Sequence, residues 1–563
     1  MIKYFSLIRK VVFVTAALVF ISVHQNSFGE NSVKRTSGII QEKKLTSVFK
    51  QVNLFSFEKN VNENDNSSSF VSSASLLNLK KESLIRILKS REENIVFKIP
   101  VSDNNSIELE LTQSFPASEN ILLMSIGRNG KKIEPYTPGL HYNGIIKGKD
   151  NSIAAISIFE NSVMGILSDE NGNYILGSVK NNDNSNSFKY IFYNDNDLNI
   201  RNTFKCGIDD SQDKFVLALK NAENHSSNNF QTDNISTLPV KVYFEADYQI
   251  YLDGQENSSA VFDFILGMFN SVKTIYQNES IPTEISSIAV WTVPDPYINL
   301  TDPADILFAF GELTQDDFEG NLAHLLSTRQ EGFGGIAWIR VLCAEYDPQS
   351  YSGRYAFSNI DPGYNNYPVY SWTVNVVTHE MGHNMGSKHT QACIWPIGGT
   401  FKTIDSCYTP EGNCTYNPHP SIGTIMSYCH LWIGSGGGVN LSLGFGPLPG
   451  DTIRLRYNQA ACLLRTLNSS EAPATFDLDQ NFPNPFNPST TIRFALPVET
   501  FVDLKIYDVN GKEVASLIRN KYFNKGFFEQ TFNSSQYSLA SGIYFYRLKT
   551  SEFSEVRRMI LLK

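Results

Sequence analysis

The sequence has few features that would indicate membrane embedding or nucleic-acid binding. After the first 29 residues, no apolar run is long enough to cross a bilayer as a helix. The formal net charge is −10, from 57 acidic and 47 basic side chains, so electrostatics give no reason to expect nucleic-acid binding. No acidic loop has a convincing calcium-binding pattern. We expect neither a nucleic-acid partner nor a transmembrane segment in the mature protein.

The N-terminus has the composition of an export signal. Three basic residues, Lys3, Arg9 and Lys10, precede an apolar run at residues 11–23 that is too short for a comfortable membrane span. Small residues at 27 and 29 suit cleavage after Gly29. We expect residues 1–29 to be a signal peptide, with an uncleaved anchor as the alternative.

Histidine is scarce, yet three of the nine histidines fall within eleven residues, from His379 to His389. The stretch reads His-Glu-x-x-His-x-x-Gly-x-x-His. His379 and His383 are four residues apart, so on a helix both imidazoles face one side and can reach one metal ion. Glu380 is placed to accept a proton from a metal-bound water. Gly386 lets the chain leave the helix and turn back, which would deliver His389 as a third ligand.

Three nitrogen ligands leave the fourth position of a tetrahedral zinc ion open to water, as a catalytic site requires. The pattern therefore predicts a Zn²⁺ site held by His379, His383 and His389, with Glu380 as the general base. The alternative is a chance cluster on an amphipathic helix. The ligand spacing of all three histidines argues against that alternative.

This pattern resembles the metzincin clan of zinc endopeptidases. The clan has a methionine turn downstream, and residues 424–428 (Thr-Ile-Met-Ser-Tyr) match it, which implies that Met426 lies beneath the metal. The residue after the third ligand is Thr390, where reprolysins usually have Asp. Tyr428 matches a tyrosine of astacin- and serralysin-like enzymes that can approach the zinc. It is either a hydrogen-bond donor to the transition state or a packed aromatic residue.

Strand patterns dominate the region before the histidines. Residues 95–99 and 106–111 read as strands, and further short strands separated by glycine and Asn/Asp turns lie between residues 142 and 179. The 142–179 segment resembles the propeptide of reprolysin-type (ADAM-like) metalloproteases. Residues 30–69 are polar and rich in Asn and Ser, so we expect little fixed structure there.

Cysteine is also scarce, and its number, seven, is odd. An exported chain is expected to form disulfides, and six of the cysteines lie between Cys343 and Cys462. Cys206 stands apart, in a Lys-Cys-Gly-Ile segment that resembles the cysteine switch of latent metzincins. The resemblance implies that Cys206 is a zinc ligand in the latent form only. A thiol without that role, or a disulfide partner, is the alternative. Residues 220–236 would be the linker for activating cleavage, although they lack a multibasic site.

The reprolysin resemblance also implies a disulfide between Cys343 and Cys462. The four other cysteines allow three connectivities. Of these we prefer Cys393–Cys429 together with Cys407–Cys414.

Strand and helix patterns alternate through the region of the histidines. Strands are predicted at 238–244, 285–293 and 334–343, and helices at 259–277, 306–313, 371–384 and 451–464. In the resembled family, the 334–343 segment is the sheet edge along which an extended substrate lies, since an exposed edge can pair with an added strand. An ordinary strand is the alternative.

The composition changes again from about residue 471. The sequence Asn-Phe-Pro-Asn-Pro-Phe at 481–486 is followed by short alternating strands and a hairpin turn at 508–511. This region resembles the C-terminal sorting domain of type IX secretion cargo in Gram-negative bacteria. The resemblance implies passage through the outer-membrane type IX secretion machinery and a secreted or cell-surface location. A generic β adhesion or carbohydrate-binding module is the alternative.

The sequence thus predicts a multidomain chain. It comprises a signal peptide (1–29), a β-rich propeptide (30–237), an α/β metzincin catalytic domain with a mixed twisted sheet and an active-site helix (238–467), and a C-terminal all-β sandwich (472–563). The resemblances imply a secreted zinc metalloendopeptidase, made as a latent zymogen, that acts on protein or peptide substrates. One alternative is a surface adhesion or binding protein with a catalytically silent metzincin domain, against which Glu380 argues. The other is a toxin or processing enzyme with a single partner substrate.

Overall fold

In the computed structural model, the described residues form two compact units, one within residues 35–463 and one within residues 475–561. The structure describes residues 35–61, 69–179, 189–200, 205–207, 238–329, 334–360, 368–463 (except 416, 418, 421 and 432–437) and 475–561 (except 482–483, 485, 487 and 538). The expected signal peptide and the expected cleavage linker at 220–236 lie outside the described residues.

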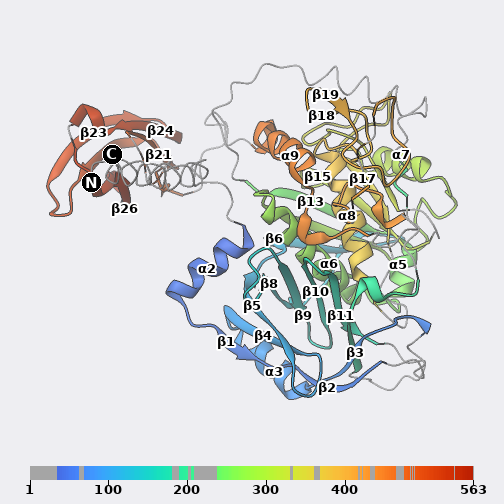
Figure 1. Cartoon of the computed structure of the whole chain (residues 1–563). Helices are drawn as coiled ribbons and strands as arrows, with labels where there is room; N and C mark the ends of the chain where they lie inside the picture. Colours follow the sequence, from blue (N-terminus) through green and yellow to red (C-terminus); the bar gives the residue numbers. More distant parts are fainter. Residues whose placement is uncertain are drawn as a thin grey trace, which may run out of the picture. The chain divides into compact units, whose positions relative to one another are not determined.

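A ten-stranded sheet forms one layer of the larger unit, with the strand order β1-β4-β5-β8-β9-β10-β11-β12-β3-β2 (Figure 1). Its strands are β1 (Lys50–Val52), β2 (Phe55–Asn60), β3 (Ser75–Leu79), β4 (Asn94–Pro100), β5 (Ser106–Ser114), β8 (Leu140–Ile146), β9 (Ile153–Ile158), β10 (Val163–Asp169), β11 (Gly172–Ser178) and β12 (Lys189–Asn194). Helix α3 (Lys81–Ser90) connects β3 and β4. The strands predicted between residues 95 and 179 are confirmed.

The expectation of little fixed structure at residues 30–69 is wrong for residues 36–60. Helix α2 (Thr36–Thr46) is followed by β1 and β2, which lie at opposite edges of the ten-stranded sheet. Ile40 and Leu54 have no exposed surface, and Phe55 is 3% exposed. A few buried apolar side chains are enough to order a polar segment when a preformed sheet receives them. Local composition cannot reveal that sheet.

A seven-stranded sheet forms the second layer, with the order β16-β17-β15-β13-β14-β6-β7. Its strands are β6 (Ala117–Gly127), β7 (Gly130–Ile133), β13 (Val240–Ala246), β14 (Thr283–Trp291), β15 (Leu322–Ser327), β16 (Gly335–Ala337) and β17 (Tyr355–Asn359). The helices of this half are α5 (Tyr248–Asp253), α6 (Ser258–Asn278), α7 (Pro303–Thr314), α8 (Tyr370–Asn384) and α9 (Pro447–Gln459). The strand predicted at 334–343 is confirmed only over 335–337, at one edge of the sheet.

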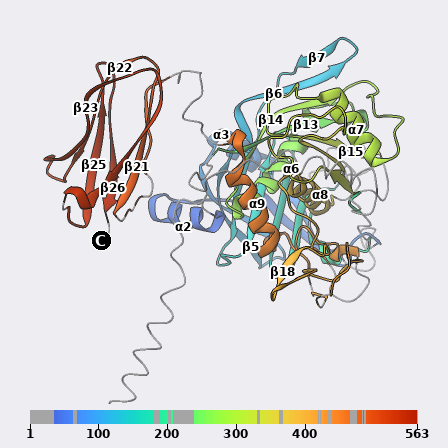
Figure 2. The same cartoon turned by 90° about the horizontal axis from the view of Figure 1, so that it is seen from above.

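Residues from the predicted propeptide complete this second sheet. Strand β6 runs parallel to β14, with pairs from Ser287↔Leu122 to Trp291↔Ile126, and β7 forms the outer edge. Figure 2 shows the β6–β7 hairpin beside β14 and β13. The seven-stranded sheet therefore draws strands from both sides of the expected boundary at residue 237.

Helix α6 joins the two sheets because it is apolar on nearly every side. Fourteen of its 21 residues are buried, as expected for a helix enclosed by other elements. It packs against β8, β9 and β10 of the first sheet and against β14 of the second (Figure 1). The Asn270 amide on this helix donates to the carbonyl of Tyr142 on β8, at 3.0 Å.

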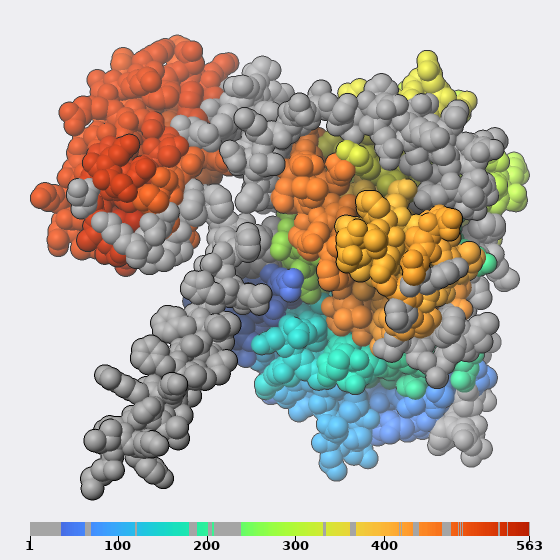
Figure 3. Space-filling model, turned by 45° about the horizontal axis from the view of Figure 1, so that its top comes forward, coloured from blue at the N-terminus to red at the C-terminus, as the bar shows by residue number. Residues whose placement is uncertain are grey.

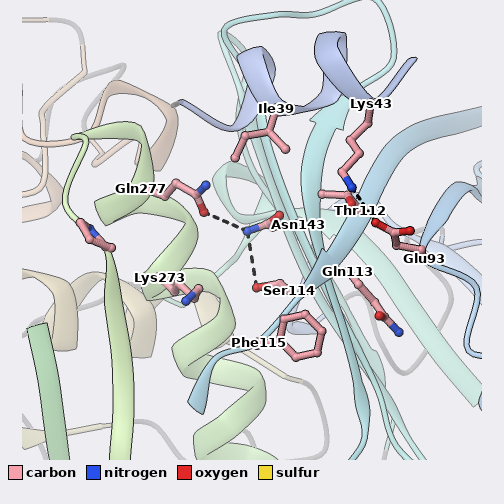
Figure 4. A pocket seen from close by; sticks show the side chains of 11 residues that line it. Ile39, Lys43, Glu93, Thr112, Gln113, Ser114, Phe115, Asn143, Lys273 and Gln277 are labelled. Carbon is pink, nitrogen blue, oxygen red and sulfur yellow. Dashed lines mark hydrogen bonds and ion pairs between the residues drawn. The ribbon is translucent and has the colours of Figure 1, made fainter. Parts of the chain in front are cut away.

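Helix α2 lies beside α6 and the ten-stranded sheet, and a cavity of about 480 Å³ opens where the three meet (Figure 4). Ile39 and Lys43 of α2 line it, together with Lys273 and Gln277 of α6. At its rim, the Asn143 amide donates to Oε1 of Gln277 at 3.3 Å. Thr36, at the start of α2, donates through its backbone N–H and its hydroxyl to Oδ1 of Asn278 on α6. The start of the described chain is thus tied to a helix of the predicted catalytic domain.

The C-terminal unit consists of two small antiparallel sheets with a shared core. One has the order β20-β21-β24 and the other β23-β22-β25-β26. The strands are β20 (Asp477–Leu478), β21 (Ser489–Leu496), β22 (Thr500–Tyr507), β23 (Glu513–Phe523), β24 (Gly526–Asn533), β25 (Gly542–Lys549) and β26 (Ser554–Leu561). Alternating residues of both sheets, among them Ile492, Leu504 and Tyr546, are fully buried. The predicted β-rich C-terminal domain is confirmed. No helix among the described residues has the length and apolarity to cross a membrane.

Candidate metal centre

Helix α8 carries the first two histidines and Glu380. Fourteen of its fifteen residues are buried, so the helix runs through the core rather than along the surface. It ends at Asn384, and Gly386 then adopts a φ of +95°, which a glycine tolerates better than other residues. The predicted helix and its glycine exit are confirmed. The Asn384 amide donates to the carbonyls of Trp338 and Tyr355, both at 2.9 Å, and so attaches the helix end to the sheet.

Three imidazoles converge beyond this helix. Nε2 of His383 lies 3.1 Å from Nε2 of His379 and 3.1 Å from Nε2 of His389. Two nitrogens bound to one tetrahedral zinc ion would be separated by about 3.3 Å, given zinc–nitrogen bonds of about 2.0–2.1 Å. All three side chains are buried, and burial lowers the pKa of His379 and His383 well below 6.5. The imidazoles of His379 and His383 are therefore neutral, as metal ligands must be.

The outer nitrogen of each ring has its own hydrogen-bond partner, which directs Nε2 toward the centre. These contacts are His379 Nδ1 to the carbonyl of Ile425 at 2.8 Å, His383 Nδ1 to the carbonyl of Ser387 at 2.8 Å, and His389 Nδ1 to a carboxylate oxygen of Glu411 at 2.5 Å. The sequence analysis missed Glu411. No local signal marks it, because it lies in a loop 22 residues after His389.

The methionine turn lies directly under helix α8. A Cβ at Gly382 would lie 2.9 Å from the sulfur of Met426 and 2.6 Å from the ring of Phe445, so only glycine allows this approach. Both the backbone N–H and the hydroxyl of Thr390 donate to the carbonyl of Met426, at 3.0 and 3.3 Å. Thr390, the departure from the reprolysin pattern, thus connects the third histidine to the turn.

The structure places Cys206 at the open side of the three imidazoles. Its sulfur lies 3.6 Å from Nε2 of His383 and 3.6 Å from a carboxylate oxygen of Glu380. A thiolate and an imidazole bound to one zinc ion would be about 3.6 Å apart, given bonds of about 2.3 and 2.05 Å. Cys206 and the three histidines form one group whose ligand atoms lie within 4.8 Å of one another.

The segment around Cys206 pairs with edge strand β16. The N–H of Gly207 donates to the carbonyl of Gly335 at 2.7 Å, and the N–H of Gly334 donates to the carbonyl of Lys205 at 3.1 Å. The bridge between Cys206 and Gly335 is parallel. Residues 205–207 therefore occupy the outer edge of this strand.

Glu380 is fully buried beside the histidines. Burial raises the pKa of its carboxyl group well above 4.5, against an opposing hydrogen bond from the Cys206 thiol. Its Oε1 atom has no hydrogen-bond partner among the described residues. A Cβ at Gly335 would lie 2.7 Å from this oxygen, so the glycine leaves room for it. A buried carboxyl oxygen with no hydrogen-bond partner in the described part of the chain, beside three converging imidazoles, fits a site that holds a metal ion and its water.

Tyr428 contacts both the histidines and the Cys206 segment. Its ring centroid lies 4.8 Å from that of His389, and its hydroxyl donates to the carbonyl of Cys206 at 3.2 Å. Burial raises the pKa of the phenol well above 10, so it stays a proton donor. The ring packs as the packed-aromatic alternative requires, and the role of Tyr428 as a donor to the transition state stays a prediction.

The six cysteines other than Cys206 form three disulfides. The predicted Cys343–Cys462 bond is confirmed. The preference for the other four cysteines is wrong, because the bonds are Cys393–Cys414 and Cys407–Cys429. The backbone of Glu411 pairs with that of Ala392, which brings residue 414 back to residue 393. The spacing of the cysteines in the sequence does not reveal that these loops cross.

The segments after α8, in yellow and orange, gather on one face of this unit (Figure 3).

Comparisons with known proteins identify two family matches in this chain. Residues 236–431 match the model of metallo-peptidase family M12, of the reprolysin type, and residues 480–562 match the secretion system C-terminal sorting domain. Human disintegrin and metalloproteinase domain-containing protein 9 is 23% identical over 308 residues, which are 50% of this chain and 36% of the human protein. The chain thus spans about a third of that relative's length.

Several solved structures also match. Two crystal structures of OgpA from Akkermansia muciniphila, one of the wild type and one of an inactive form with an O-glycopeptide, are 11% identical, with TM-scores of 0.21. Each match covers 60% of this chain and 95% of the other chain.

The expected resemblances to a reprolysin-like metallopeptidase and to a C-terminal sorting domain are confirmed. The chain carries a reprolysin-like M12 metallopeptidase domain and a C-terminal secretion sorting domain. The sorting domain indicates export to the cell surface or the medium. Members of family M12 depend on a metal ion, and the group of Cys206 and three histidines offers candidate ligands for one.

Proposed function

We propose that this chain, which carries a reprolysin-like M12 metallopeptidase domain and a secretion sorting domain, is a zinc-dependent endopeptidase made as a latent precursor. The observation that carries the proposal is the convergence of three Nε2 atoms, with that of His383 3.1 Å from each of the other two, beside the buried side chain of Glu380. Protein or peptide substrates are the expected class.

In this proposal His379, His383 and His389 hold the metal ion. A zinc ion, when bound there, would supply a water of lowered pKa and a positive charge to polarise the scissile carbonyl. Glu380 accepts the proton of the attacking water and returns it to the leaving amine. Its Oε1, which has no partner among the described residues, is available for that proton.

Latency rests on the segment at residues 205–207. The sulfur of Cys206 occupies the position that water needs, and the pairing with β16 occupies the edge along which a substrate strand would add. Removal of this segment frees the position that water needs and the edge of β16. It also releases the hydroxyl of Tyr428 from the carbonyl of Cys206, so that the phenol can donate to the oxygen of a substrate carbonyl.

The domain proposal follows from these roles. Residues 1–29 act as the signal peptide, 30–237 as the propeptide, 238–467 as the catalytic domain and 472–563 as the cargo domain for the type IX machinery.

Export through the type IX machinery is testable by deletion of residues 472–563. The truncated protein should accumulate in the periplasm with its catalytic activity intact, and normal release would contradict the sorting role.

The catalytic proposal is tested by cleavage of a quenched-fluorescent peptide library with the processed protein. Glu380→Ala and a chelator-treated sample are the controls, and we expect activity to be lost in both. The cut sites would then define the preferred substrate. A folded, zinc-loaded protein without its propeptide that cleaves nothing would contradict the proposal and favour a binding role for the domain.

A further inference from the structure

One of the three histidines differs from the other two in its outer contact. His379 and His383 donate their Nδ1–H groups to backbone carbonyls, whereas His389 donates to the carboxylate of Glu411 at 2.5 Å. His389 is 1% exposed, and the side chain of Glu411 is 14% exposed. The contact is therefore largely shielded from solvent.

The position of His389 in the fold explains why it needs a stronger partner. The other two histidines belong to helix α8, whose backbone hydrogen bonds hold them in place. His389 lies in a non-helical segment three residues after Gly386, where its ring orientation depends on side-chain contacts. A hydrogen bond to a charged acceptor is shorter and stronger than one to a neutral carbonyl. It therefore restrains the ring more than a carbonyl would.

Glu411 is itself held by the segment that follows His389. Its backbone N–H donates to the carbonyl of Gln391 at 3.1 Å, and its carbonyl accepts the N–H of Cys393 at 3.0 Å. The side-chain amide of Gln391 donates to the same carboxylate oxygen at 3.2 Å. The Cys393–Cys414 disulfide closes this loop close to Glu411. The carboxylate is thus delivered by a cross-linked loop with two backbone contacts.

We propose that Glu411 is a positioning residue of the metal centre, an assignment that rests on the proposed zinc site. By accepting the Nδ1–H of His389, it holds the imidazole in the tautomer that presents Nε2 to the metal, and it raises the basicity of that nitrogen. A merely structural hydrogen bond would stabilise the loop without affecting the metal. The two roles therefore predict different effects of replacing Glu411 on the zinc affinity of the chain.

The experiment measures zinc affinity by competition with a chromogenic chelator. It uses the full chain with Cys206→Ser, so that the histidines alone hold the ion. Glu411→Gln should weaken zinc binding by about 10- to 100-fold, the usual effect of losing such a partner. Thermal unfolding in excess chelator, measured on the same samples, reports the structural contribution of the side chain separately.

Glu245→Gln is the matched control. Glu245 is a buried carboxylate on β13 that accepts hydrogen bonds from Tyr243, Trp291 and Tyr297. Its replacement should lower the unfolding temperature equally with and without zinc and leave zinc affinity unchanged. Equal zinc affinity in Glu411→Gln and the parent chain would overturn the assignment, as would an equal loss in both variants.

A second variant covers the case in which Glu411→Gln does not fold. Gln391→Ala removes the amide that donates to the carboxylate and keeps Glu411 itself. It should weaken zinc binding several-fold, and unchanged binding would overturn the assignment. Failure of the proposed function can be distinguished from failure of the Glu411 assignment. The proposed function fails if the parent chain binds no zinc or if the processed protein cleaves no peptide.

Discussion

The sulfur of Cys206 lies 3.6 Å from Nε2 of His383, although 177 positions separate the two residues in the chain. The contact places a thiol from the predicted propeptide among the three imidazoles. It is supported on either side by the backbone pairing of residues 205–207 with β16. In the proposed latent form, chemical blocking of the centre and physical covering of the sheet edge would act through the same short segment.

Replacing Cys206 by Ser tests the chemical part of this block. Serine is a much poorer zinc ligand than a cysteine thiolate, so water should enter the fourth position. We expect the unprocessed Cys206→Ser chain to cleave peptides at least about tenfold faster than the unprocessed parent chain, which corresponds to about 1.4 kcal/mol. The activity should stay below that of the processed protein, because residues 205–207 still cover β16. The Cys206→Ser/Glu380→Ala chain is the control. An equally silent Cys206→Ser precursor would refute the switch.

The propeptide should stay bound after a single cut between residues 220 and 236. Strand β6 is part of the seven-stranded sheet, and α6 packs against both sheets, so the two fragments share a core. A protease site inserted in this range allows the cut, and size-exclusion chromatography should show both fragments in one peak.

Two neighbouring residues of β6 supply a matched pair for this prediction. Leu123 is 5% exposed and Leu122 is 42% exposed. Leu123→Asp buries a charge in the core and should release the N-terminal fragment after the cut, whereas Leu122→Asp should not. Separation of the two fragments in the parent chain would show that the shared sheet does not hold them together.

Gly335→Ala should lower the activity of the processed protein without removing the metal. A Cβ at this position would lie 2.7 Å from both Cγ and Oε1 of Glu380 and 2.7 Å from the carbonyl of Phe357, so the base or the strand must move. Displacing a catalytic group by about 1 Å can cost about 100-fold in rate. We expect kcat to fall by this order while zinc content stays at one per chain. Unchanged kcat would show that Glu380 tolerates the displacement.

His324 of β15 should contribute to the change in the free energy of unfolding with pH. This side chain is 1% exposed, its Nε2 lies 2.8 Å from the hydroxyl of Ser358, and burial lowers its pKa to about 3. The folded chain keeps the ring neutral, whereas the unfolded chain protonates it near the ordinary value of about 6.5. Between these values the unfolded state binds more protons. The free energy of unfolding therefore falls as the pH decreases, by up to about 1.4 kcal/mol per pH unit from this group.

His324→Gln removes this titration and should flatten the slope between about pH 3 and pH 6.5. Denaturant unfolding at several pH values measures it. His141, whose pKa burial also lowers to about 3, offers a second test, because the double variant should flatten the slope further. Parallel pH profiles for the parent chain and His324→Gln would contradict the prediction.

The sequence by itself determined the elements whose signals are local. The four-residue spacing of His379 and His383, the glycine that ends their helix and the alternating strands of the C-terminal domain all follow from backbone periodicity. The resemblances to a metzincin and to a sorting domain also rest on short contiguous motifs. The placement of the two histidines on one face of a helix can be predicted without knowledge of the rest of the chain.

The tertiary structure alone decided which distant segments meet. Glu411 reaches His389, Cys393 pairs with Cys414, and the β6–β7 hairpin completes a sheet made of later residues. The ordering of residues 36–60 belongs to the same class, because its few apolar side chains are buried by partners far along the chain. Such contacts depend on how loops close around a common core, and the free energy of that closure is shared among many segments, so no single stretch of sequence records it.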